Sequence, residues 1–322
     1  MPQIVVSNQN NPYLNLAVEN YLLSQPDVGG ALLYLWQNRR TVVIGQNQNP
    51  FAECNVERLE ADGGYLMRRR TGGGAVYHDL GNLNFSFVVP EAGYDVARQL
   101  SVMQHAVEAF GLHTEVSGRN DVLCEGRKFS GNAFSRGGIN RLHHGTILIR
   151  TDVAELQRYL IAKPAKLHKH GVASVQSRIV NLSELVDSIN AEALKPLLVE
   201  AFEQEYGKAE RLDFDSIALR PEVKSLRDEF ASDQWKYGRW RTFRTQRHAQ
   251  YERGEVDLAV TVDEAAGRID EVLIASDSLN PEAIALAERM LKHAPLDVCP
   301  DTSGCPHKEM LDDIFKLIYE KD

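Results

Sequence analysis

The part of the sequence most able to do chemistry is a glycine run preceded by arginines. Three arginines at positions 68–70 stand just before three consecutive glycines at positions 72–74. Because glycine has no Cβ, the backbone of such a run can adopt positive φ and come close to a ligand. Its N–H groups can then converge on an anion, and nearby guanidinium groups suit phosphate or carboxylate. The run predicts an anion-binding loop of neither the P-loop nor the G-x-G-x-x-G type, with a plain hairpin turn as the alternative.

A second polar cluster follows between residues 117 and 132. Asp121 ends the sequence Ser-Gly-Arg-Asn-Asp, and its carboxylate could hold a divalent cation together with phosphate oxygens. Lys128 stands between Arg127 and Phe129, so a strand here would point only one of the two cations inward. A buried lysine without a carboxylate partner needs an anionic ligand. Two exposed turns are the alternative reading of this cluster.

Histidines and cysteines offer weaker candidates. His143 and His144 are adjacent, so on a strand they face opposite sides and cannot easily bind one metal ion. Cys299, Cys305 and His307, with His293, could bind zinc, but the Cys-x₅-Cys spacing is unusual for a zinc site. Reduced, structural thiols are therefore expected, and no protein metal site is assigned.

Composition sets the broad class. The chain has 322 residues and a net charge of −9, with 43% hydrophobic and 25% charged residues. This is typical of a globular protein of about two domains, and an acidic chain has no general field for nucleic acid. The N-terminus lacks the pattern of a secretory signal, and no run approaches the ~20 apolar residues of a membrane span. A cytoplasmic protein, without membrane or nucleic-acid partners, is expected.

The elements that must position these residues alternate between helix and strand. Apolar residues at helical spacing predict helices in the first two thirds at 12–26, 56–61, 95–111, 153–160, 191–206 and 221–230. Short apolar or alternating runs predict strands at 31–36, 41–44, 83–87 and 146–149. The mixture indicates an α+β (mixed α/β) fold.

The composition shifts near residue 236. A basic and aromatic run extends from Lys236 to Arg247, followed by a hairpin pattern at 256–274 and helices at 281–291 and 310–319. We expect a domain at residues 1–245 and a small α/β domain at residues 246–322. The basic run could instead mark a single-strand nucleic-acid module.

Five motifs in order carry a family resemblance. They are Arg69-x-x-Gly-Gly-Gly-Ala-Val-Tyr-His-Asp-x-Gly-Asn82, Gly118-Arg-Asn-Asp121, Gly126-Arg-Lys-Phe-Ser-Gly131, His144-Gly-Thr146 and Ser174-Val-x-Ser-Arg178. The chain resembles the lipoate–protein ligase A family of the biotin/lipoate ligase superfamily. Arg70 departs from the pattern, which has a small hydroxyl residue there.

The resemblance implies a catalytic domain with mixed sheets flanked by helices, and a two-step reaction. Lipoate and Mg-ATP give lipoyl-AMP and pyrophosphate, and the lipoyl group then passes to a lysine. The implied acceptors are the lipoyl domains of 2-oxoacid dehydrogenase E2 subunits and the glycine-cleavage H protein. A monomer is expected.

The resemblance also implies roles for individual residues. Lys128 is the implied catalytic lysine, which contacts both lipoate and ATP. The other implied ATP contacts are Arg69, Gly74, Ala75, Val76 and Tyr77, and the other lipoate contacts are Gly73, Gly74, His78 and His144. Asp121 and Asn120 are implied near Mg²⁺ or phosphate, and Ser174, Ser177 and Arg178 in an adenylate loop.

The chemistry agrees with a role for Lys128. Lipoate is already ionised at neutral pH, so the obstacle is to bring two anions together, which preorganised donors can do. In the second step the acceptor lysine must lose a proton, to Asp121 or to water. Phe85, Phe87, Val76 and Tyr77 are candidates for the apolar slot of the lipoyl tail.

Two other enzymatic readings remain open. An octanoyl or lipoyl transferase would work through a thioester on cysteine, for which Cys124 is the nearest candidate. A lipoyltransferase that uses preformed lipoyl-AMP would need no ATP. The acyl preference is left undecided.

Overall fold

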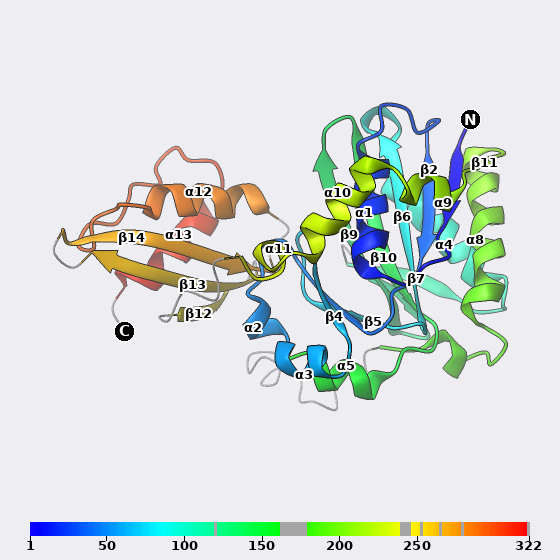
Figure 1. Ribbon diagram of the computed structural model, residues 1–322, viewed down its shortest axis with the longest axis horizontal. Helices are drawn as coiled ribbons and strands as arrows, with labels where there is room; N and C mark the ends of the chain where they lie inside the picture. The colour runs from blue at the N-terminus through cyan, green and yellow to red at the C-terminus, as the bar shows by residue number, and fades with distance from the viewer. Residues whose placement is uncertain are drawn as a thin grey trace.

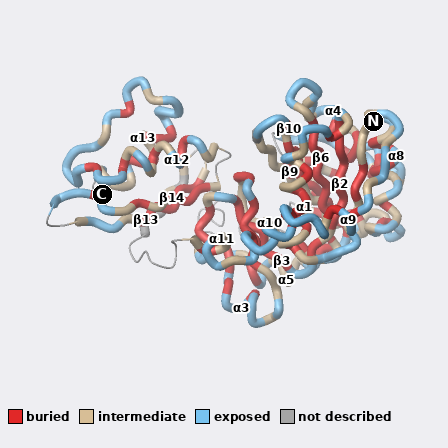
Figure 2. The backbone as a smooth tube through the Cα atoms, turned by 45° about the horizontal axis from the view of Figure 1, so that its top comes forward, coloured by how far each residue is buried: buried red, intermediate tan, exposed pale blue. Residues whose placement is uncertain are grey.

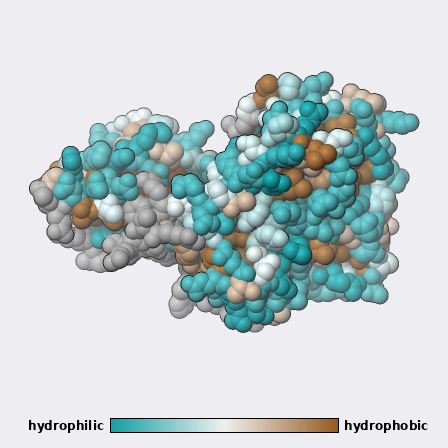
Figure 3. Space-filling view, viewed as in Figure 1, coloured by the Kyte–Doolittle hydropathy of each residue, from teal (hydrophilic) through white to brown (hydrophobic). Residues whose placement is uncertain are grey.

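Two bodies of unequal size make up the molecule. The computed structural model describes residues 1–118, 121–161, 179–238, 246–251, 254–263, 266–277 and 280–320. The larger body holds the N-terminal elements through α11, and the smaller one holds β12 to α13 (Figure 1). Among the described residues, no helix has the length and apolar character needed to cross a membrane. Hydrophilic side chains cover most of the face seen in Figure 3.

A mixed eight-stranded sheet forms the centre of the larger body. Its strands, in spatial order, are β11 (Glu210–Arg211), β1 (Gln3–Val6), β2 (Leu32–Trp36), β6 (Asn82–Pro90), β10 (Asn140–Leu148), β9 (Arg127–Gly137), β8 (Asp121–Cys124) and β7 (Thr114–Ser117). The pairs β11–β1 and β1–β2 are parallel, and all later neighbours are antiparallel. The strand expected at 146–149 is therefore the end of the longer β10.

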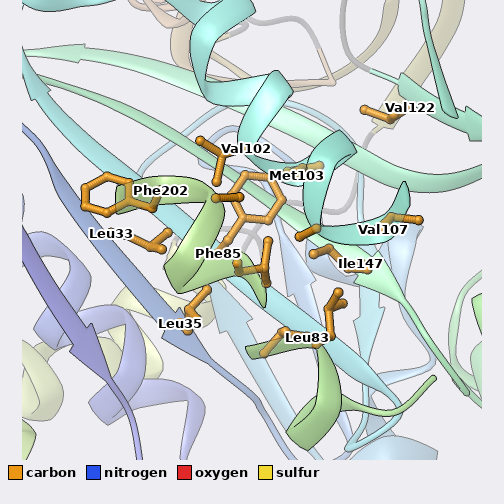
Figure 4. Packing of buried hydrophobic residues seen from close by; sticks show 14 of the residues in the cluster. Leu33, Leu35, Leu83, Phe85, Val102, Met103, Val107, Val122, Ile147 and Phe202 are labelled. Atoms are coloured by element: carbon orange, nitrogen blue, oxygen red, sulfur yellow. The ribbon is translucent and has the colours of Figure 1, made fainter. Parts of the chain in front are cut away.

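Helices cover both faces of this sheet, so β2 and nearly all of β6 are buried (Figures 1 and 2). One face packs against α4 (Val96–Glu108) and α8 (Ala191–Tyr206), and the other against α1 (Pro12–Leu23) and α10 (Pro221–Ala231). Strand side chains alternate between the faces. In β2, Leu33 and Leu35 join the α4–α8 core, which is drawn in Figure 4, whereas Leu32, Tyr34 and Trp36 face α1.

A second, three-stranded sheet lies beside the α1 face. It has the order β4 (Tyr65–Arg68), β3 (Thr41–Ile44), β5 (Val76–His78). Its own core includes Leu59 of α3 (Val56–Ala61), Tyr159 of α5 (Val153–Tyr159) and Tyr237 of α11 (Asp233–Tyr237). The glycine run is the connection between β4 and β5, so this sheet holds both ends of the run. The remaining short elements are α2 (Pro50–Glu53), η1 (Glu91–Gly93), η2 (Leu182–Glu184) and α9 (Phe214–Ala218).

The smaller body has a separate hydrophobic core. Strands β12 (Gln246–Tyr251), β13 (Gly254–Asp263) and β14 (Arg268–Ser276) form an antiparallel sheet that packs against α12 (Pro281–Leu291) and α13 (Lys308–Tyr319). The predicted mixed α/β class with an additional C-terminal region is confirmed. The boundary at residue 245 borders the undescribed residues 239–245 and stays a prediction.

The starts of the predicted helices follow from local capping. Asn11, Asn190 and Asn280 each precede a helix, and each side chain accepts a hydrogen bond from a backbone N–H of the first turn. Pro12 and Pro281 occupy the first helical positions, where a missing N–H costs nothing. These helix starts were therefore readable from the sequence.

Arg68 ties three segments of the larger body together. Its guanidinium is buried and donates to the carbonyls of Gly45, Gln46 and Gln48 in one loop. It also donates to the carbonyls of Trp235 and Lys236 in α11. Burial lowers the pKa of Arg68 to about 10, so the group stays charged at neutral pH. The same loop reaches the smaller body, because Ser276 N–H donates to the carbonyl of Asn47 at 3.0 Å.

Replacement of Arg68 tests this role. In Arg68→Met five backbone carbonyls lose a charged donor, so we expect the free energy of unfolding to fall by about 2–4 kcal/mol. Urea denaturation followed by tryptophan fluorescence measures it. Arg70→Met is the matched control, because Arg70 makes a half-exposed ion pair with Glu229 and its loss should cost about 1 kcal/mol or less. Equal losses in the two variants would contradict the role of Arg68.

Candidate functional site

A pocket of about 260 Å³ opens on the α1 side of the central sheet. Its floor comes from neighbouring strands, with Trp36 on β2, Asn84 on β6, Thr146 on β10 and Asp121 on β8. Its walls come from α1, from β3 and from the glycine run with the start of β5. The lining residues are Leu16, Trp36, Val43, Arg69, Gly73, Gly74, Ala75, Val76, His78, Asn84, Asp121, Lys128, Gly131, Asn132, Ala133, His144, Gly145 and Thr146.

The glycine run is shaped from inside by Arg69. This side chain is 6% exposed, and its nitrogens donate to Thr71 Oγ1 and to the carbonyls of Val43, Gly72 and Gly74. Burial lowers the pKa of Arg69 to about 10, which still leaves the group charged at neutral pH. In a planar trans peptide the next N–H points opposite to the carbonyl. The N–H groups of Gly73 and Ala75 therefore point away from Arg69, as an anion-binding loop requires.

Close packing explains two glycines around this run. A Cβ on Gly45 would lie 2.2 Å from the carbonyl oxygen of Gly73, so the loop at 45–48 and the glycine run touch backbone to backbone. Gly73 itself has φ of 94°, a conformation that favours glycine. Arg68 and Arg69 thus hold two loops that pack against each other.

Lys128 and Asp121 form an ion pair at the other side of the pocket. Lys128 Nζ lies 2.7 Å from Asp121 Oδ1, and the two side chains are 36% and 41% exposed. The expected alternation on this strand is confirmed, because Phe129 lies in the core and Arg127 pairs with Glu184 at the surface. Lys128 therefore has a carboxylate partner at the pocket, and both charges are accessible to a ligand.

A buried polar chain runs behind the pocket wall. Glu19 of α1 is 2% exposed, and its Oε1 accepts from Ser86 Oγ at 2.5 Å and from His144 Nδ1 at 2.8 Å. His144 Nε2 lies 2.9 Å from Thr71 Oγ1, and the same hydroxyl oxygen accepts from Arg69 Nε. The chain links α1, β10 and the glycine run through a histidine that lines the pocket.

The two adjacent histidines lie on opposite faces of β10, as their positions on a strand predict. His143 is fully buried in the α4–α8 core, with Nδ1 2.8 Å from Gln99 Oε1 and Nε2 2.8 Å from Asn132 Oδ1. Burial, followed by the nearby His144, lowers the pKa of His143 to about 3, so the ring is neutral. A neutral imidazole has one N–H, so one of these amides must present its NH₂ group to the ring.

His78 also lines the pocket and is 3% exposed. Burial, followed by the nearby Arg69 and His144, lowers the pKa of His78 to about 3. It is therefore neutral at physiological pH. His78 and His144 come from different sheets and meet at the same wall of the pocket.

Three of the residues expected to line the apolar slot for the lipoyl tail do not line the pocket. Phe85, labelled in Figure 4, and Phe87 both lie in the core with α4 and α8, because β6 directs its odd-numbered side chains away from the pocket. Tyr77 packs in the core of the small sheet and borders a different surface pocket. The apolar lining is formed instead by Val76, which was expected, together with Leu16, Trp36 and Val43.

Several expected site residues cannot be placed. Asn120, Ser174, Ser177 and Arg178 lie outside the described residues, as does most of the basic run after Lys236. The ends of that run make internal contacts, since Lys236 pairs with Asp233 and Arg247 donates to the carbonyl of Leu317.

The cysteines do not line the pocket. Cys124 is fully buried in the α4–α8 core, and burial raises the pKa of its thiol. Cys54 is buried as well, and burial raises its pKa to about 12. Near the C-terminus, Cys299 is exposed and His307 Nδ1 bonds to Asn280. Within the described parts of the chain, no group of three or more His, Cys, Asp or Glu could hold a metal ion.

Sequence reasoning missed the polar groups that face α1. Glu19 interrupts the apolar stripe of a predicted helix, and Asn84 and Ser86 alternate with buried apolar residues on β6. The alternation indicated one buried face and one polar face, and the polar face of β6 is buried as well. A charged or amide residue within a strongly apolar element was the available signal.

Solved structures with a similar fold are lipoate ligases. P. falciparum LipL1, determined in complex with lipoate, has a TM-score of 0.82 at 28% identity and covers all of both chains. A bipartite lipoate protein ligase from Thermoplasma acidophilum, determined with its E2 lipoyl domain, has a TM-score of 0.62 at 25% identity, over 74% of this chain and 96% of that chain. A lipoate-protein ligase A bound with ATP shares the fold, with a TM-score of 0.62 at 22% identity over 74% and 98%. The fold is thus that of the lipoate ligase class.

Sequence comparison identifies the family within this class of ligases. The family described as "Lipoyl protein ligase A/B catalytic domain" matches residues 11–203. Lipoate-protein ligase A of Psychrobacter cryohalolentis is 37% identical over 303 residues, which are 92% of this chain and 89% of that protein. The corresponding protein of Bdellovibrio bacteriovorus is 38% identical over 289 residues, or 88% and 85%. The chain belongs to the lipoate-protein ligase A family of enzymes.

Substitution of two glycines on neighbouring strands distinguishes an effect on the pocket from an effect on the stability of the fold. In Gly131→Ala the new Cβ would lie 3.0 Å from Cε and Nζ of Lys128, a flexible end that can move aside. We expect unchanged thermal stability but about tenfold lower ligase activity, because the ammonium is displaced. In Gly145→Ala the Cβ would lie 2.6 Å from the Gly131 carbonyl and from Phe85. That variant should lose about 1–3 kcal/mol of stability. A Gly131→Ala enzyme with full activity would contradict the placement of Lys128.

The buried His143 should make stability depend on pH. Its folded pKa of about 3 lies below the ordinary value of 6.5, so the unfolded chain binds a proton between these values that the folded chain does not. Above pH 6.5 the ring is neutral in both states, so His143 does not lower the free energy of unfolding. Below pH 6.5 the free energy of unfolding falls as the pH drops. In His143→Gln, the slope of the unfolding free energy against pH should be smaller by about 1.4 kcal/mol per pH unit near pH 5.

Urea denaturation from pH 4 to pH 8 measures this slope. Above pH 7.5 the wild-type and His143→Gln proteins should have equal slopes, because a histidine is then neutral in both states. An equal slope at pH 5 would mean that His143 is protonated in the folded protein.

Proposed function

We propose that the chain is an ATP-dependent lipoate–protein ligase. It activates lipoate to lipoyl-AMP with release of pyrophosphate, and it then transfers the lipoyl group to a lysine of an acceptor domain. The observation that carries the proposal is the pocket itself. It combines an apolar slot at Leu16, Trp36 and Val43 with the Lys128 ammonium and the backbone of the glycine run.

In the first step, a carboxylate oxygen of lipoate attacks the α-phosphorus of ATP, and the bond to the β-phosphate oxygen breaks. Both reactants are anions, so the enzyme must offset their repulsion. Lys128 would leave Asp121 in part and bind the carboxylate and the α-phosphate. The N–H groups of Gly73 and Ala75 would bind phosphate oxygens, and Arg69 would keep those groups oriented. No nucleophilic side chain takes part.

The residues present also fit a magnesium ion carried by the nucleotide. Asp121 is the one carboxylate among the described residues that line the pocket, and magnesium usually binds one or two carboxylates together with phosphate oxygens and water. Asp121 would hold the ion, and Mg²⁺ when bound would neutralise charge on the phosphates.

In the second step, the ε-amine of the acceptor lysine attacks the carbonyl carbon of lipoyl-AMP, and AMP leaves. The amine must lose a proton, and Asp121 would accept it, as the carboxylate among the described residues that line the pocket. A carboxylate that is 41% exposed is also open to an incoming side chain.

The proposed acceptors are lipoyl domains of 2-oxoacid dehydrogenase E2 subunits and the glycine-cleavage H protein. The related ligase of T. acidophilum was determined with its E2 lipoyl domain, which supports the first of these. Mass spectrometry of each acceptor after incubation with lipoate and ATP distinguishes them.

Burial argues against the thioester alternative. Cys124 is 0% exposed, its pKa is raised, and it faces the core opposite the pocket. A nucleophilic cysteine needs an accessible thiolate, which this environment disfavours.

Pyrophosphate exchange tests the proposal. We expect lipoate-dependent exchange of labelled pyrophosphate into ATP, reduced at least about 100-fold in Lys128→Met because the ammonium offsets the repulsion of the two anions. Cys124→Ala should keep the exchange. Arg127→Met is the matched control, because that neighbouring cation faces the surface.

The alternatives give different results. Loss of acyl transfer in Cys124→Ala without any exchange in the wild type would indicate a thioester transferase. Acceptor labelling from lipoyl-AMP but not from lipoate and ATP would indicate a transferase that lacks the activation step.

A further inference from the structure

A chain of amide groups determines which nitrogen of His78 carries its proton. Asn15 Nδ2 donates to the carbonyls of Gln9 and Gln37, which fixes the orientation of this amide. Asn15 Nδ2 also donates to Asn38 Oδ1 at 3.0 Å, so the other end of the Asn38 amide is its NH₂ group. That group lies 3.2 Å from His78 Nδ1. His78 Nδ1 must therefore accept, and in a neutral ring the proton sits on Nε2.

The Nε2–H group of His78 is a buried donor that lines the pocket. Its nitrogen is inaccessible to solvent and has no hydrogen-bond partner among the described residues. A second donor lies nearby on β6. Asn84 is 1% exposed, its Oδ1 accepts from Asn82 Nδ2 at 2.9 Å, and its Nδ2 is likewise unpartnered within the described structure. Two buried unpaired donors are costly, which indicates that a ligand supplies their acceptor.

Strand register places these donors away from Lys128. Asn84 pairs with Thr146, which pairs with Gly131, and the Lys128 ammonium lies over Gly131. Asn84 on β6 is thus two strands from β9, a distance of about 10 Å. His78 lies near the same end, because its ring is 5.9 Å from that of Trp36, which pairs with Asn84 across the sheet. The extended carbon chain of lipoate covers this span when its carboxylate is at Lys128.

We propose that His78 Nε2–H and Asn84 Nδ2–H bind the sulfur atoms of the dithiolane ring and make the enzyme select lipoate over a saturated acid such as octanoate. The inference rests on the proposed function, since it takes the carboxylate to lie at Lys128. Disulfide sulfur is a weak, polarisable acceptor, whereas the methyl end of octanoate leaves both donors unpaired. A site with unpaired buried donors rejects the analogue that lacks an acceptor.

Acid-dependent pyrophosphate exchange with lipoate and with octanoate tests the inference. The wild-type kcat/KM should favour lipoate by at least about tenfold. In Asn84→Leu and in His78→Phe the ratio should fall by about tenfold, because lipoate loses a donor and octanoate gains an apolar contact. Thr146→Val is the matched control: it removes a polar group one strand closer to Lys128, so it should change both acids alike. An unchanged ratio in both donor variants would overturn the inference.

A second measurement uses the unaltered enzyme and does not depend on the folding of any variant. An eight-carbon acid that ends in a hydroxyl group offers an oxygen acceptor to the same donors, so its kcat/KM should equal or exceed that of octanoate. In a slot without donors the hydroxyl would be desolvated unpaired and the acid would be used less well, which would overturn the inference. Exchange with none of the three acids would instead refute the proposed function.

Discussion

Polar groups on the α1 face of the central sheet are buried, and each must find a hydrogen-bond partner or retain a desolvation cost. Ser86, His144 and Trp36 meet this requirement through Glu19 or through each other. Because Glu19 is on α1, the network fixes the helix over the sheet and leaves a pocket beside it. If only apolar side chains met between α1 and the sheet, close packing would have filled this space. The pocket exists because the helix and the sheet meet through polar side chains of fixed geometry.

Positive charge inside the protein serves mainly to orient backbone. Three successive arginines point in three directions: Arg68 to the loop at 45–48 and α11, Arg69 to the glycine run, and Arg70 to Glu229 at the surface. Guanidinium groups suit this task because five N–H donors in one plane can bind several carbonyls at once. The accessible cation of the pocket is then Lys128, whose partner Asp121 can be replaced by a ligand. Arg68 and Arg69 thus orient the backbone, whereas Lys128 is the cation that a ligand can reach.

Neutral histidines complete this division. His78 lines the pocket and His143 lies behind the sheet, and burial lowers the pKa of both to about 3. Neutral rings add hydrogen-bond donors and acceptors without adding charge. The charged side chains of Lys128, Arg69 and Asp121 line the same pocket, in a chain whose net charge is −9.

The sequence alone indicated the longer helices, some of the strands, the mixed α/β class and the membership suggested by its motifs. Helical spacing of apolar residues marked α1, α8 and α12, since this signal acts over a few residues. It also indicated that Lys128 and Phe129 would face opposite sides of a strand, because strand periodicity is local.

Only the tertiary structure decided which side of each strand lines the pocket and which side lies in the core. Phe85 and Phe87 looked like slot residues, yet they pack against α4 and α8. Asn84 and Ser86, on the polar face of the same strand, are buried on the side that faces α1. Which face of a strand becomes a binding site depends on the helices that cover it, and those helices are far away in the sequence. The same holds for Glu19, whose partners Ser86 and His144 lie on strands that begin more than 60 residues later.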